Sequence, residues 1–591
     1  MPIPEVIKQS TAEAIKALYG ADVPAADITL NVTSKEFDGD FSVVVFVLTK
    51  YSKRKPEETA NAIGEWLKTN GSVVESFNVI KGFLNLRLSN TVWSDLLQSA
   101  DQASGFLPRQ SPQKIVLEYC GPNTNKPLHL GHIRNMVIGY AMSEILRACG
   151  HDVHRVNIYN DRGIAICKSM LAWKRFGNGA TPQSSGVKGD VLVGDYYVKF
   201  DEEYGKEIAE LMAKGMSEGQ AEREAPIFKE AQEMLRKWEA GDEETLNLWR
   251  MMNGWVYDGF EVTYKRLGVD FEKHYYESEH YLSGKTLVHE GLKSGVFFRK
   301  DDGSVWVDLT DEGLDQKVLL RSDGTSVYLT QDLGTAQARY NDYMMDRSIY
   351  VVADEQDYHF KTLKLTLQRL GKPFAEGIYH LSYGMVELPE GKMKSREGTK
   401  VDADPLISEM EQTAEAHTRE LGKIDNFDSD EARELYRILS LGALKFFLLK
   451  VHPKKRMVFN PKESVQFHGD TGPFVQYTYA RIRSVLRKAS LTPTPSPKER
   501  GVELHVTERD LLVHFARYSE VIEDAAKQYD PSHLALFLLS LAKSYNRFYT
   551  VLSILGAENE QRALRLRLSE VTAMIIHHGM ELLGIEVPER M

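Results

Sequence analysis

Two stretches far apart in the chain show the same succession of a strand, a helix and a second strand. The ranges are Lys114–Tyr119, His132–Cys149 and Val153–Ile158 in the first stretch, and Ile349–Ala353, Tyr358–Leu370 and Ile378–Tyr383 in the second. Strands that are joined through a helix in this way run parallel. Two such units predict one doubly wound sheet of the Rossmann type, in which ligands bind beyond the carboxyl ends of the strands.

Other regions of different character surround this predicted sheet. Residues 1–110 read as a small α+β unit, with helices expected at Ile3–Leu18 and Pro56–Thr69 and strands at Ser42–Thr49 and Gly82–Leu88. Residues of about 168–300 read as a helical insertion between the halves of the sheet. From about Arg433 onward the periodicity is helical, which predicts a bundle of helices at Leu435–Val451, Val475–Lys488, Glu508–Gln528, Pro531–Leu555 and Arg562–Leu583.

The predicted fold class is therefore a multidomain α/β plus α protein. It has a small N-terminal α+β domain (1–110), a Rossmann-type parallel-sheet domain with a helical insertion (111–405), and an all-helical C-terminal part (406–591). The apolar runs are too short to cross a bilayer. The three cysteines form no CxxC pair, which argues against a disulfide framework or a thiolate zinc site. We expect a cytoplasmic protein.

The segment between the first strand and its helix, CGPNTNKPLHLGHIRN, carries two histidines, His129 and His132. At the start of a helix they could ligate a metal, cap the helix or face a phosphate group, because a helix N-terminus favours an anion. A third metal ligand is not evident. On spacing alone, a pair of histidines of this kind more often lies on the protein surface without a specific function than in a site.

The wider sequence context favours a site. His129-Leu-Gly-His132 resembles the HIGH signature of class I aminoacyl-tRNA synthetases, and the string from Glu118 to His132 resembles the form found in arginyl-tRNA synthetases. Lys392-Met-Lys-Ser-Arg396, after the second half of the sheet, resembles the KMSKS loop of the same family. Further matching segments are Tyr328–Asp332, Gln356–His359, Gln476–Arg483 and Leu582–Met591. The resemblance extends over nearly the whole chain.

The resemblance implies that arginine and ATP form arginyl-adenylate and that the arginyl group then passes to the 3′ end of its tRNA. It implies that ATP is bound by His129, Gly131, His132, Lys392, Met393, Lys394 and Ser395. The catalytic residues that it implies are His129, His132, Lys126, Lys394 and Arg396. The usual second lysine of the loop is replaced by Ser395, and Lys126 stands where a compensating lysine is found in arginyl members.

The same resemblance assigns the pocket for arginine to Glu118, Asn123, Tyr328, Asp332 and Gln356. Carboxylates suit this task because a guanidinium presents paired N–H donors and keeps its charge. A site built on buried acids rejects uncharged analogues by a factor of about 10⁴ or more, so no editing domain is expected. The 168–300 insertion is left with a structural or tRNA-supporting role.

Transfer RNA is expected on several surfaces. In the helical part, the resemblance indicates an anticodon-binding domain with Tyr477, Tyr479, Arg481, Arg483 and Arg487 as tRNA-binding residues. Tyr545 and the basic clusters at 454–456 and 562–567 are further candidates for stacking and for phosphate contacts. The expected partners are tRNA(Arg), arginine and ATP with its Mg²⁺, with no tightly bound protein metal and no membrane. The family suggests a monomer.

Three alternatives stay open at this point. The chain resembles synthetases in general, so activation of lysine or glutamate would identify another amino acid as the substrate. A non-catalytic tRNA-binding paralogue is a second possibility, although intact His129, His132, Glu118 and Asp332 argue against it. A metal-binding protein is the third, and metal analysis of the purified protein would decide it.

Overall fold

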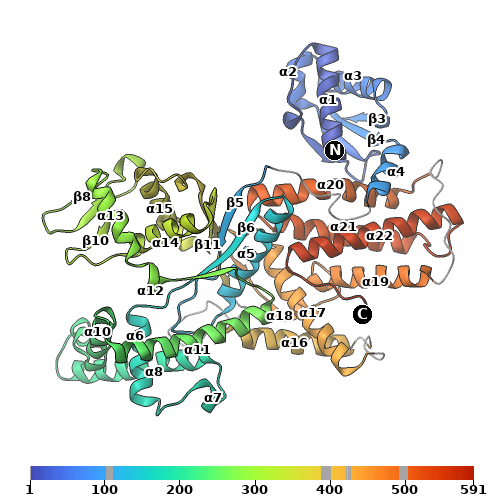
Figure 1. Cartoon of the computed structure of the whole chain (residues 1–591). Coiled ribbons are helices and arrows are strands. Elements are labelled where there is room, and N and C mark those ends of the chain that lie inside the picture. The colour runs from blue at the N-terminus through green and yellow to red at the C-terminus, as the bar shows by residue number, and fades with distance from the viewer. Residues whose placement is uncertain (1, 101–110, 388–400, 421, 423–426, 491–502) are drawn as a thin grey trace. The chain divides into compact units, whose positions relative to one another are not determined.

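The chain forms two compact units. The computed structural model describes residues 2–100, 111–387, 401–420, 422, 427–490 and 503–591. One unit consists of Ser111–Thr413 and Val451–Pro461, and the other of Met1–Gln110, Ala414–Lys450 and Lys462–Met591. Figure 1 shows the whole chain and labels many of the elements of both units.

The first unit is built on a five-stranded sheet in which every pairing is parallel. The strand order is β12-β11-β5-β6-β7. The strands are β5 (Lys114–Glu118), β6 (Asp152–Tyr159), β7 (Lys273–Tyr276), β11 (Arg347–Ala353) and β12 (Ile378–Tyr383). The chain builds outward from β5 to β7 on one side and then adds β11 and β12 on the other. The direction of winding therefore changes between β5 and β11, where a doubly wound sheet opens its ligand crevice.

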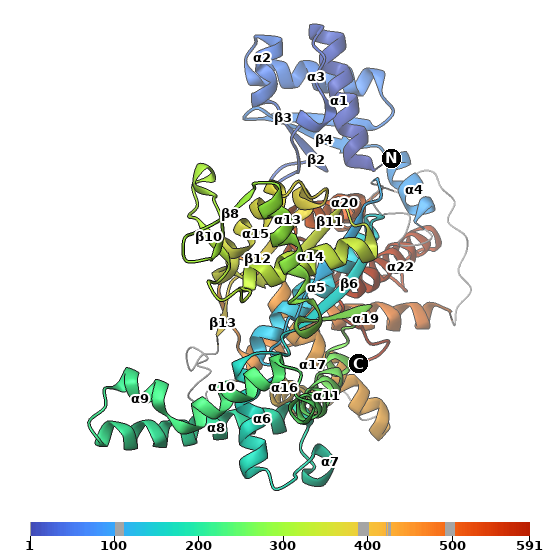
Figure 2. The same ribbon diagram turned by 60° about the vertical axis from the view of Figure 1, so that its left-hand side comes forward.

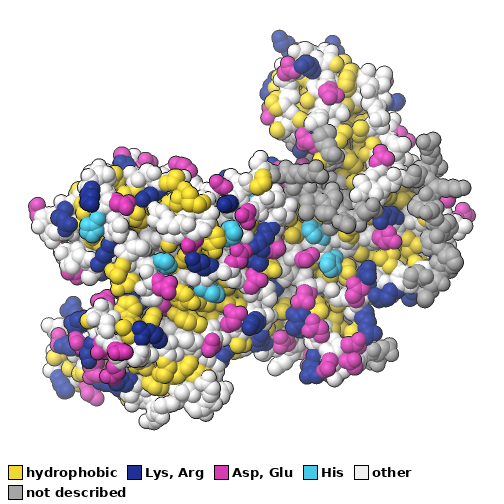
Figure 3. Space-filling model, viewed as in Figure 1, with side chains coloured by type: hydrophobic (Ala, Val, Ile, Leu, Met, Phe, Trp, Pro, Cys, Tyr) yellow, Lys and Arg dark blue, Asp and Glu magenta, His cyan; other side chains and the backbone are white. Residues whose placement is uncertain are grey.

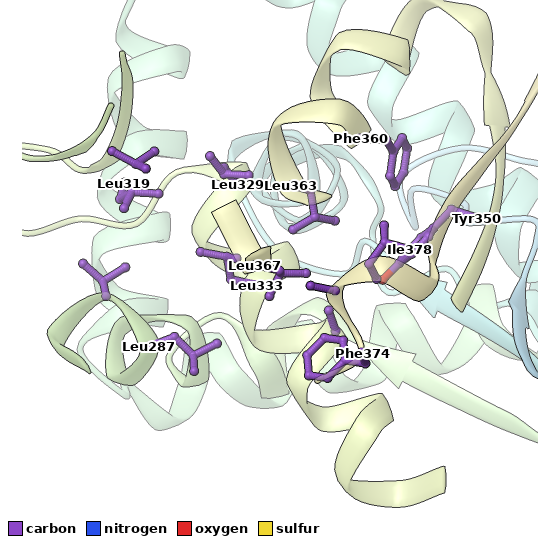
Figure 4. Close-up of a cluster of buried hydrophobic side chains, with 14 of the residues drawn as sticks. Leu287, Leu319, Leu329, Leu333, Tyr350, Phe360, Leu363, Leu367, Phe374 and Ile378 are labelled. Atoms are coloured by element: carbon purple, nitrogen blue, oxygen red, sulfur yellow. The ribbon is translucent and has the colours of Figure 1, made fainter. Parts of the chain in front are cut away.

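Helices packed against this sheet fix the elements around the crevice. They are α5 (Leu130–Ala148), α13 (Ser283–Lys293), α14 (Tyr328–Tyr343) and α15 (Asp357–Arg369). In α14, Leu329, Leu333 and Ala336 recur at helical spacing and are buried. They pack with Leu363 and with other side chains from α13, α15 and the strands, as Figure 4 shows. Figure 2 shows α14 and α15 beside β11 and β12.

The predicted helical insertion is present but ends earlier than expected. Its helices are α6 (Ile164–Phe176), α7 (Pro182–Ser185), α8 (Gly189–Ala213), α9 (Glu218–Glu224), α10 (Pro226–Glu239) and α11 (Glu243–Leu267). The range 168–300 was too long, because Lys273–Tyr276 is the edge strand β7 of the main sheet. This strand is short and reads Lys-His-Tyr-Tyr, so it lacks the apolar run that marks the inner strands.

Smaller elements complete the first unit. After β7 come α12 (Glu277–His280) and a three-stranded antiparallel sheet of β8 (Phe297–Arg299), β9 (Val305–Val307) and β10 (Lys317–Leu320). A two-stranded parallel pair joins β13 (Val386–Glu387) to β14 (Met457–Val458). Helix α16 (Ala403–Glu420) begins in this unit and continues into the other.

The N-terminal part of the second unit is the expected α+β structure. Helices α1 (Ile3–Tyr19), α3 (Pro56–Asn70) and α4 (Asn90–Ser99) accompany an antiparallel sheet of order β1-β2-β4-β3. Its strands are β1 (Leu30–Val32), β2 (Phe41–Val44), β3 (Val74–Ile80) and β4 (Phe83–Leu88). The strand expected at Ser42–Thr49 was too long. The chain turns at Val45 into a 3₁₀ helix at Phe46–Leu48 and the short α2 (Thr49–Ser52), with Phe46 and Val47 exposed.

The rest of the second unit confirms the predicted helical bundle. Its helices are α17 (Ser429–Leu449), α18 (Pro461–Ser464), α19 (Gly472–Ser490), α20 (Val506–Gln528), α21 (Ser532–Val551) and α22 (Asn559–Leu582). A buried Arg509 on α20 donates to Asp40 at 3.0 Å and to the carbonyl of Leu88 at 3.3 Å. These bonds tie the bundle to the N-terminal sheet within the unit.

Candidate active site

The two histidines of the CGPNTNKPLHLGHIRN segment form the N-terminal cap of α5. His129 is the N-cap residue, and its Nδ1 accepts a hydrogen bond from the backbone N–H of Gly131 at 3.1 Å. The Nδ1 of His132 accepts one from the backbone N–H of His129, also at 3.1 Å. The ring centroids are 4.0 Å apart. The capping interpretation is therefore correct.

Capping does not compete with the phosphate interpretation, because it uses only one nitrogen of each ring. A neutral imidazole whose Nδ1 accepts a hydrogen bond carries its proton on Nε2. The cap thus fixes both rings in the tautomer with an Nε2–H donor. Donors held in place at a helix N-terminus, with its positive dipole, suit a group on which negative charge develops.

Gly131 makes this close arrangement of the rings possible. A Cβ atom at this position would lie 3.0 Å from Cε1 and 3.1 Å from Nδ1 of His129. A larger residue would crowd the His129 ring, which would have to shift by a few tenths of an ångström. Lys126, the other residue predicted here, lies half-buried in the loop between β5 and α5.

The segment that resembles the KMSKS loop lies outside the described residues, which include none of Lys392, Met393, Lys394, Ser395 and Arg396. Their predicted roles stay predictions. The residues that follow this segment are described. The backbone N–H of Leu130 donates to the carbonyl of Val401 at 3.1 Å, and that of Ala403 donates to the carbonyl of Leu128 at 2.8 Å. Residues 401–403 thus pair with the backbone on both sides of His129.

Arg134, which was not singled out from the sequence, joins α5 to two neighbouring loops. It is fully buried and donates to the carbonyls of Gly384 at 2.5 Å and Met385 at 3.3 Å. It also donates to the carbonyls of Pro453 at 3.0 Å and Lys455 at 2.8 Å. Burial lowers the pKa of the guanidinium to about 10. This role is not apparent from the sequence, since an arginine on a helix is usually exposed.

The first predicted arginine ligand, Glu118, ends strand β5 and is ion-paired inside the protein. Its Oε2 accepts a short hydrogen bond from the guanidinium of Arg339 on α14, and both residues are buried. Burial raises the pKa of Glu118 in spite of Arg339, and the charge of Asp332 raises it further. One carboxylate oxygen of Glu118 is therefore hydrogen-bonded to Arg339 on α14. Its predicted role as an arginine ligand would use the other oxygen.

Asp332 and Tyr328 lie one turn apart on α14, beside the buried face of that helix. Asp332 accepts a 2.6 Å hydrogen bond from Nε2 of His359 on α15. Although burial opposes the charged imidazole, this bond and the carboxylate charge raise the pKa of His359 overall. Tyr328 is 78% exposed, which leaves its ring available to a ligand. Gln356, just before α15, is also exposed.

Asn123 lies in the loop after β5 and is tied to the end of β6. It forms an isolated parallel bridge with Asn160, whose backbone N–H donates to the carbonyl of Pro122 at 3.0 Å. The carbonyl of Asn160 accepts from the N–H of Thr124 at 3.2 Å. The Asn123 side chain is exposed. The predicted pocket residues thus lie on β5, its following loop, α14 and the start of α15.

Glu277, which was not predicted, is an additional acid at the same edge of the sheet. It directly follows β7 and begins α12. Burial raises the pKa of its carboxyl to about 7, and the charges of Asp161 and Asp332 contribute to the rise, while Arg162 opposes it. Recognising Lys273–Tyr276 as the last strand of the sheet would have placed Glu277 at the carboxyl edge.

Asp161 holds Glu277 and the insertion in place. Its carboxylate accepts from the N–H of Ser278 at 2.9 Å and its hydroxyl at 2.7 Å, and from the Tyr257 hydroxyl on α11 at 3.0 Å. Its carbonyl accepts from the Trp249 indole at 2.6 Å. Burial raises the pKa of Asp161 as well. Buried carboxylates with raised pKa values are stabilised by a bound cation, so this edge suits a cationic ligand.

In the helical bundle, the predicted tRNA-binding residues of α19 are engaged with other protein groups. The side chain of Glu589 accepts from the Tyr479 hydroxyl at 2.9 Å and from Nε of Arg483 at 2.8 Å. Arg487 donates to the Glu589 carbonyl at 2.9 Å. Arg481 donates to Asn546 and stacks on the ring of Tyr477, with its guanidinium 4.7 Å from the ring centroid.

Two tyrosines predicted to stack on bases and one arginine predicted to bind phosphates are buried in the bundle. Tyr545 is fully buried and donates to Ser569 at 3.1 Å, and Tyr479 is only 4% exposed. Neither ring presents a face for stacking, whereas Tyr477 is partly exposed. Arg565 is buried and paired with Glu508 at 2.9 Å, which takes it out of the basic cluster at 562–567. On the face drawn in Figure 3, acidic and basic side chains are interspersed.

No helix in the described part of the chain is long and apolar enough to cross a membrane. Nor do the described residues contain a group of three or more His, Cys, Asp or Glu side chains arranged to hold a metal ion.

Comparisons with known families match the chain in three parts. The model described as "tRNA synthetases class I (R), catalytic domain" matches residues 94–460. The "DALR anticodon binding domain" matches residues 475–591, and the "Arginyl tRNA synthetase N terminal domain" matches residues 5–88.

Relatives match over the full length of both chains. The arginine–tRNA ligase of Amoebophilus asiaticus is 53% identical over 597 residues, and that of Parabacteroides distasonis is 54% identical over 598 residues. Each alignment covers 100% of both proteins. The solved structure of Thermus thermophilus arginyl-tRNA synthetase is 25% identical, with a TM-score of 0.82 and 100% of each chain covered. The Plasmodium falciparum structure, 19% identical with a TM-score of 0.78, shares the fold. The chain therefore belongs to the arginyl-tRNA synthetase family of class I synthetases.

Proposed function

We infer that the chain catalyses the arginine–tRNA ligase reaction. Arginine's carboxylate attacks the α-phosphorus of ATP and pyrophosphate leaves. A hydroxyl of the terminal ribose of tRNA(Arg) then attacks the carbonyl carbon of arginyl-adenylate, and AMP leaves. The observation that carries the proposal is the pairing of two Nε2–H donors at the start of α5 with two acids of raised pKa at the same edge of the sheet, the buried Glu118 and the half-buried Glu277.

In the first step, His129 and His132 stabilise charge on the phosphates of ATP. Their Nδ1 atoms are held by backbone N–H groups, so the Nε2–H donors need no reorganisation when charge develops in the transition state. The N-terminus of α5 adds its dipole and Gly131 leaves room for the rings. Lys126 and the loop residues Lys392, Met393, Lys394, Ser395 and Arg396 are proposed to hold the β and γ phosphates of ATP, which enters with its Mg²⁺.

The acids at the carboxyl edge bind the guanidinium of the substrate. Asp332 and the uncommitted oxygen of Glu118 are the predicted ligands, and Glu277 supports them as a third acid whose charge is coupled to Asp332. The exposed Tyr328 ring lies one turn from Asp332. Asn123 and Gln356 are proposed to bind the α-amino group. Three acids in one pocket select a cation, and the planar fork of a guanidinium matches paired carboxylates better than an ammonium does.

The remaining roles follow the regions of the chain. Residues 111–405 are proposed as the catalytic domain, 406–591 as the connecting and anticodon-binding part, and 1–110 as a domain that contacts tRNA. Arg481, Arg483 and Arg487 are proposed phosphate contacts, with the partly exposed Tyr477 alongside. We propose that the chain acts as a monomer in the cytoplasm, where aminoacyl-tRNA is consumed.

The test is amino-acid-dependent exchange of pyrophosphate into ATP, followed by aminoacylation of bulk tRNA. Arginine alone among the amino acids should support both reactions. Exchange without tRNA should be negligible, and periodate-oxidised tRNA, which cannot accept arginine, should restore it if tRNA acts through conformation. Charging with lysine or glutamate in place of arginine would refute the assignment.

A further inference from the structure

The helical insertion meets the sheet domain through a partly buried group of ionic residues. Lys188 immediately precedes α8, and its Nζ donates to Thr263 on α11 at 2.6 Å and, by a short bond, to Oδ2 of Asp404 on α16. The Thr263 hydroxyl donates to the same Oδ2 at 2.8 Å. Arg266, also on α11, donates to Oδ1 of Asp404 at 3.1 Å and to its carbonyl at 3.2 Å. One carboxylate therefore connects two helices of the insertion to α16.

This junction differs from an ordinary surface ion pair. The side chains of Lys188 and Asp404 are each only 22% exposed. Asp190, fully buried, lies 3.2 Å from Nζ of Lys188, and α11 approaches it so closely that a Cβ on Gly259 would lie 2.4 Å from its Oδ1. Partly buried charges with several hydrogen bonds have little freedom to move, whereas exposed pairs contribute little.

Asp404 directly follows residues 401–403, and the backbone of these residues is hydrogen-bonded to Leu128 and Leu130, the two neighbours of His129. Ala403 donates its N–H to the carbonyl of Leu128 at 2.8 Å, and Val401 accepts from the N–H of Leu130 at 3.1 Å. A displacement of Asp404 is therefore passed directly to the backbone on both sides of the N-cap residue of α5.

The insertion also contacts the other side of this segment. Gly194 on α8 lies against the loop before α5, where a Cβ would be 2.8 Å from Cδ of Pro127 and 3.5 Å from Cα of Lys126. Only glycine allows α8 to come so near. The segment from Lys126 to Leu130 is thus supported by α8 on one side and by residues 401–403, which Asp404 anchors, on the other.

We propose that Lys188 and Asp404 are positioning residues for adenylate formation. Through these two residues the helical insertion holds the Lys126–Leu130 segment, with its His129 donor, in position. This proposal rests on the proposed function, and it gives the helical insertion a defined role in the ligase reaction. Neither residue touches the substrates in this scheme. Because displacement of a catalytic group by about 1 Å can cost on the order of 10²-fold in rate, a partial loss of this support has a kinetic effect.

The experiment compares Lys188→Met, Asp404→Asn and the double variant with the full-length wild type, in arginine-dependent pyrophosphate exchange with tRNA present. Rates are normalised to active sites by the adenylate burst. We expect each single variant to raise KM for ATP or lower kcat by about tenfold, while KM for arginine stays within twofold. The double variant should lose no more than the worse single one, since both act through one junction.

Two control variants separate positioning from general destabilisation. Lys188→Arg keeps the cation and should recover most of the rate. Lys206→Met removes another ion pair of α8, to Glu203 at 2.7 Å, that is exposed and does not reach Asp404. It should behave as wild type. Equal losses with Lys206→Met, parallel rises in both KM values, or unchanged ATP kinetics in Lys188→Met would overturn the proposal. Lack of arginine-dependent exchange by the wild type would instead overturn the proposed function.

Discussion

If arginine binds at the proposed site, the raised pKa of Glu277 should make its affinity depend on pH in a definite direction. Burial and the charges of Asp161 and Asp332 bring this pKa to about 7. A bound guanidinium favours the ionised carboxylate, so binding lowers the pKa and releases a proton. Arginine should therefore bind more tightly as the pH rises through 7. The α-amino and guanidinium groups of arginine itself stay charged over most of this range.

The size of the effect follows from the fraction of Glu277 that is ionised. For a group with a pKa of about 7, this fraction rises roughly tenfold between pH 6 and pH 8. If only the ionised form holds the guanidinium, the dissociation constant of arginine should fall by about the same factor. His359, whose pKa is raised by its bond to Asp332, titrates in the same direction and adds to the slope.

Isothermal titration calorimetry at several pH values measures the affinity, and repeating it in buffers of different ionisation enthalpy measures the protons released. Glu277→Gln should bind arginine about ten- to a hundredfold more weakly at pH 8, because a hydrogen bond to a charged group is worth roughly 1.5–3 kcal/mol. It should also show a flatter pH profile. His359→Asn is the matched control, since it removes the second titrating group and leaves Glu277 intact.

The reasoning fails if the wild-type affinity is constant between pH 6 and pH 8, or if Glu277→Gln keeps the full wild-type slope. The pH dependence of folding stability provides an independent check. Ionisation of Glu277 should strengthen arginine binding but weaken the stability of the folded protein. An acid whose folded pKa is raised contributes stability that is present below its unfolded pKa near 4.5 and is lost as the pH rises through about 7. Glu277→Gln should therefore raise the melting temperature at pH 8 and leave it nearly unchanged at pH 5.

Three other substitutions test the cap of α5, the buried ion pair of Glu118 and the proposed tRNA-binding surface of the bundle. His129→Asn keeps an N-capping side chain but loses the Nε2–H donor, so we expect a normal melting temperature and adenylate formation slowed by ~10²-fold; near-normal turnover would leave only the capping role. Arg339→Met leaves Glu118 buried without its partner and should cost roughly 3–5 kcal/mol in urea unfolding, part of which a second substitution, Glu118→Gln, should restore. Glu589→Gln should lower KM for tRNA two- to threefold and steepen its salt dependence by removing the carboxylate that occupies Arg483; an unchanged KM would take Arg483 off the tRNA surface.

The elements with strong periodicity were predictable, and those with weak or mixed patterns were not. The range Ile378–Tyr383 agrees with β12, and α15 differs from its prediction by one residue at each end. Both have regular apolar spacing. The edge strand β7 has only four residues, and half of its side chains are polar. Its place in the sheet is fixed by pairing with β6, a contact between distant residues that local periodicity does not contain.

The same limit applies to the candidate site. The residues that lie within motifs, such as His129 and Asp332, could be proposed because their neighbours in sequence carry the signal. Glu277, Arg134 and Asp161 act through contacts with residues distant in the chain, and these contacts are not apparent from the residues around them in sequence. Their roles depend on burial and on which loops meet at the carboxyl edge of the sheet, which only the folded chain specifies.

Several polar groups of this site combine a structural hydrogen bond with a proposed role toward the substrates, and this determines which substitutions can test them. Nδ1 of His129 caps α5 while its Nε2 is the proposed donor to ATP, one oxygen of Glu118 binds Arg339 while the other is the proposed arginine ligand, and Asp332 bonds His359 through Oδ2. Alanine at any of these positions removes the structural bond and the chemical group together, so loss of activity would not tell which mattered. Substitutions that keep one bond and remove the other are required, because only they move the rate and the stability independently.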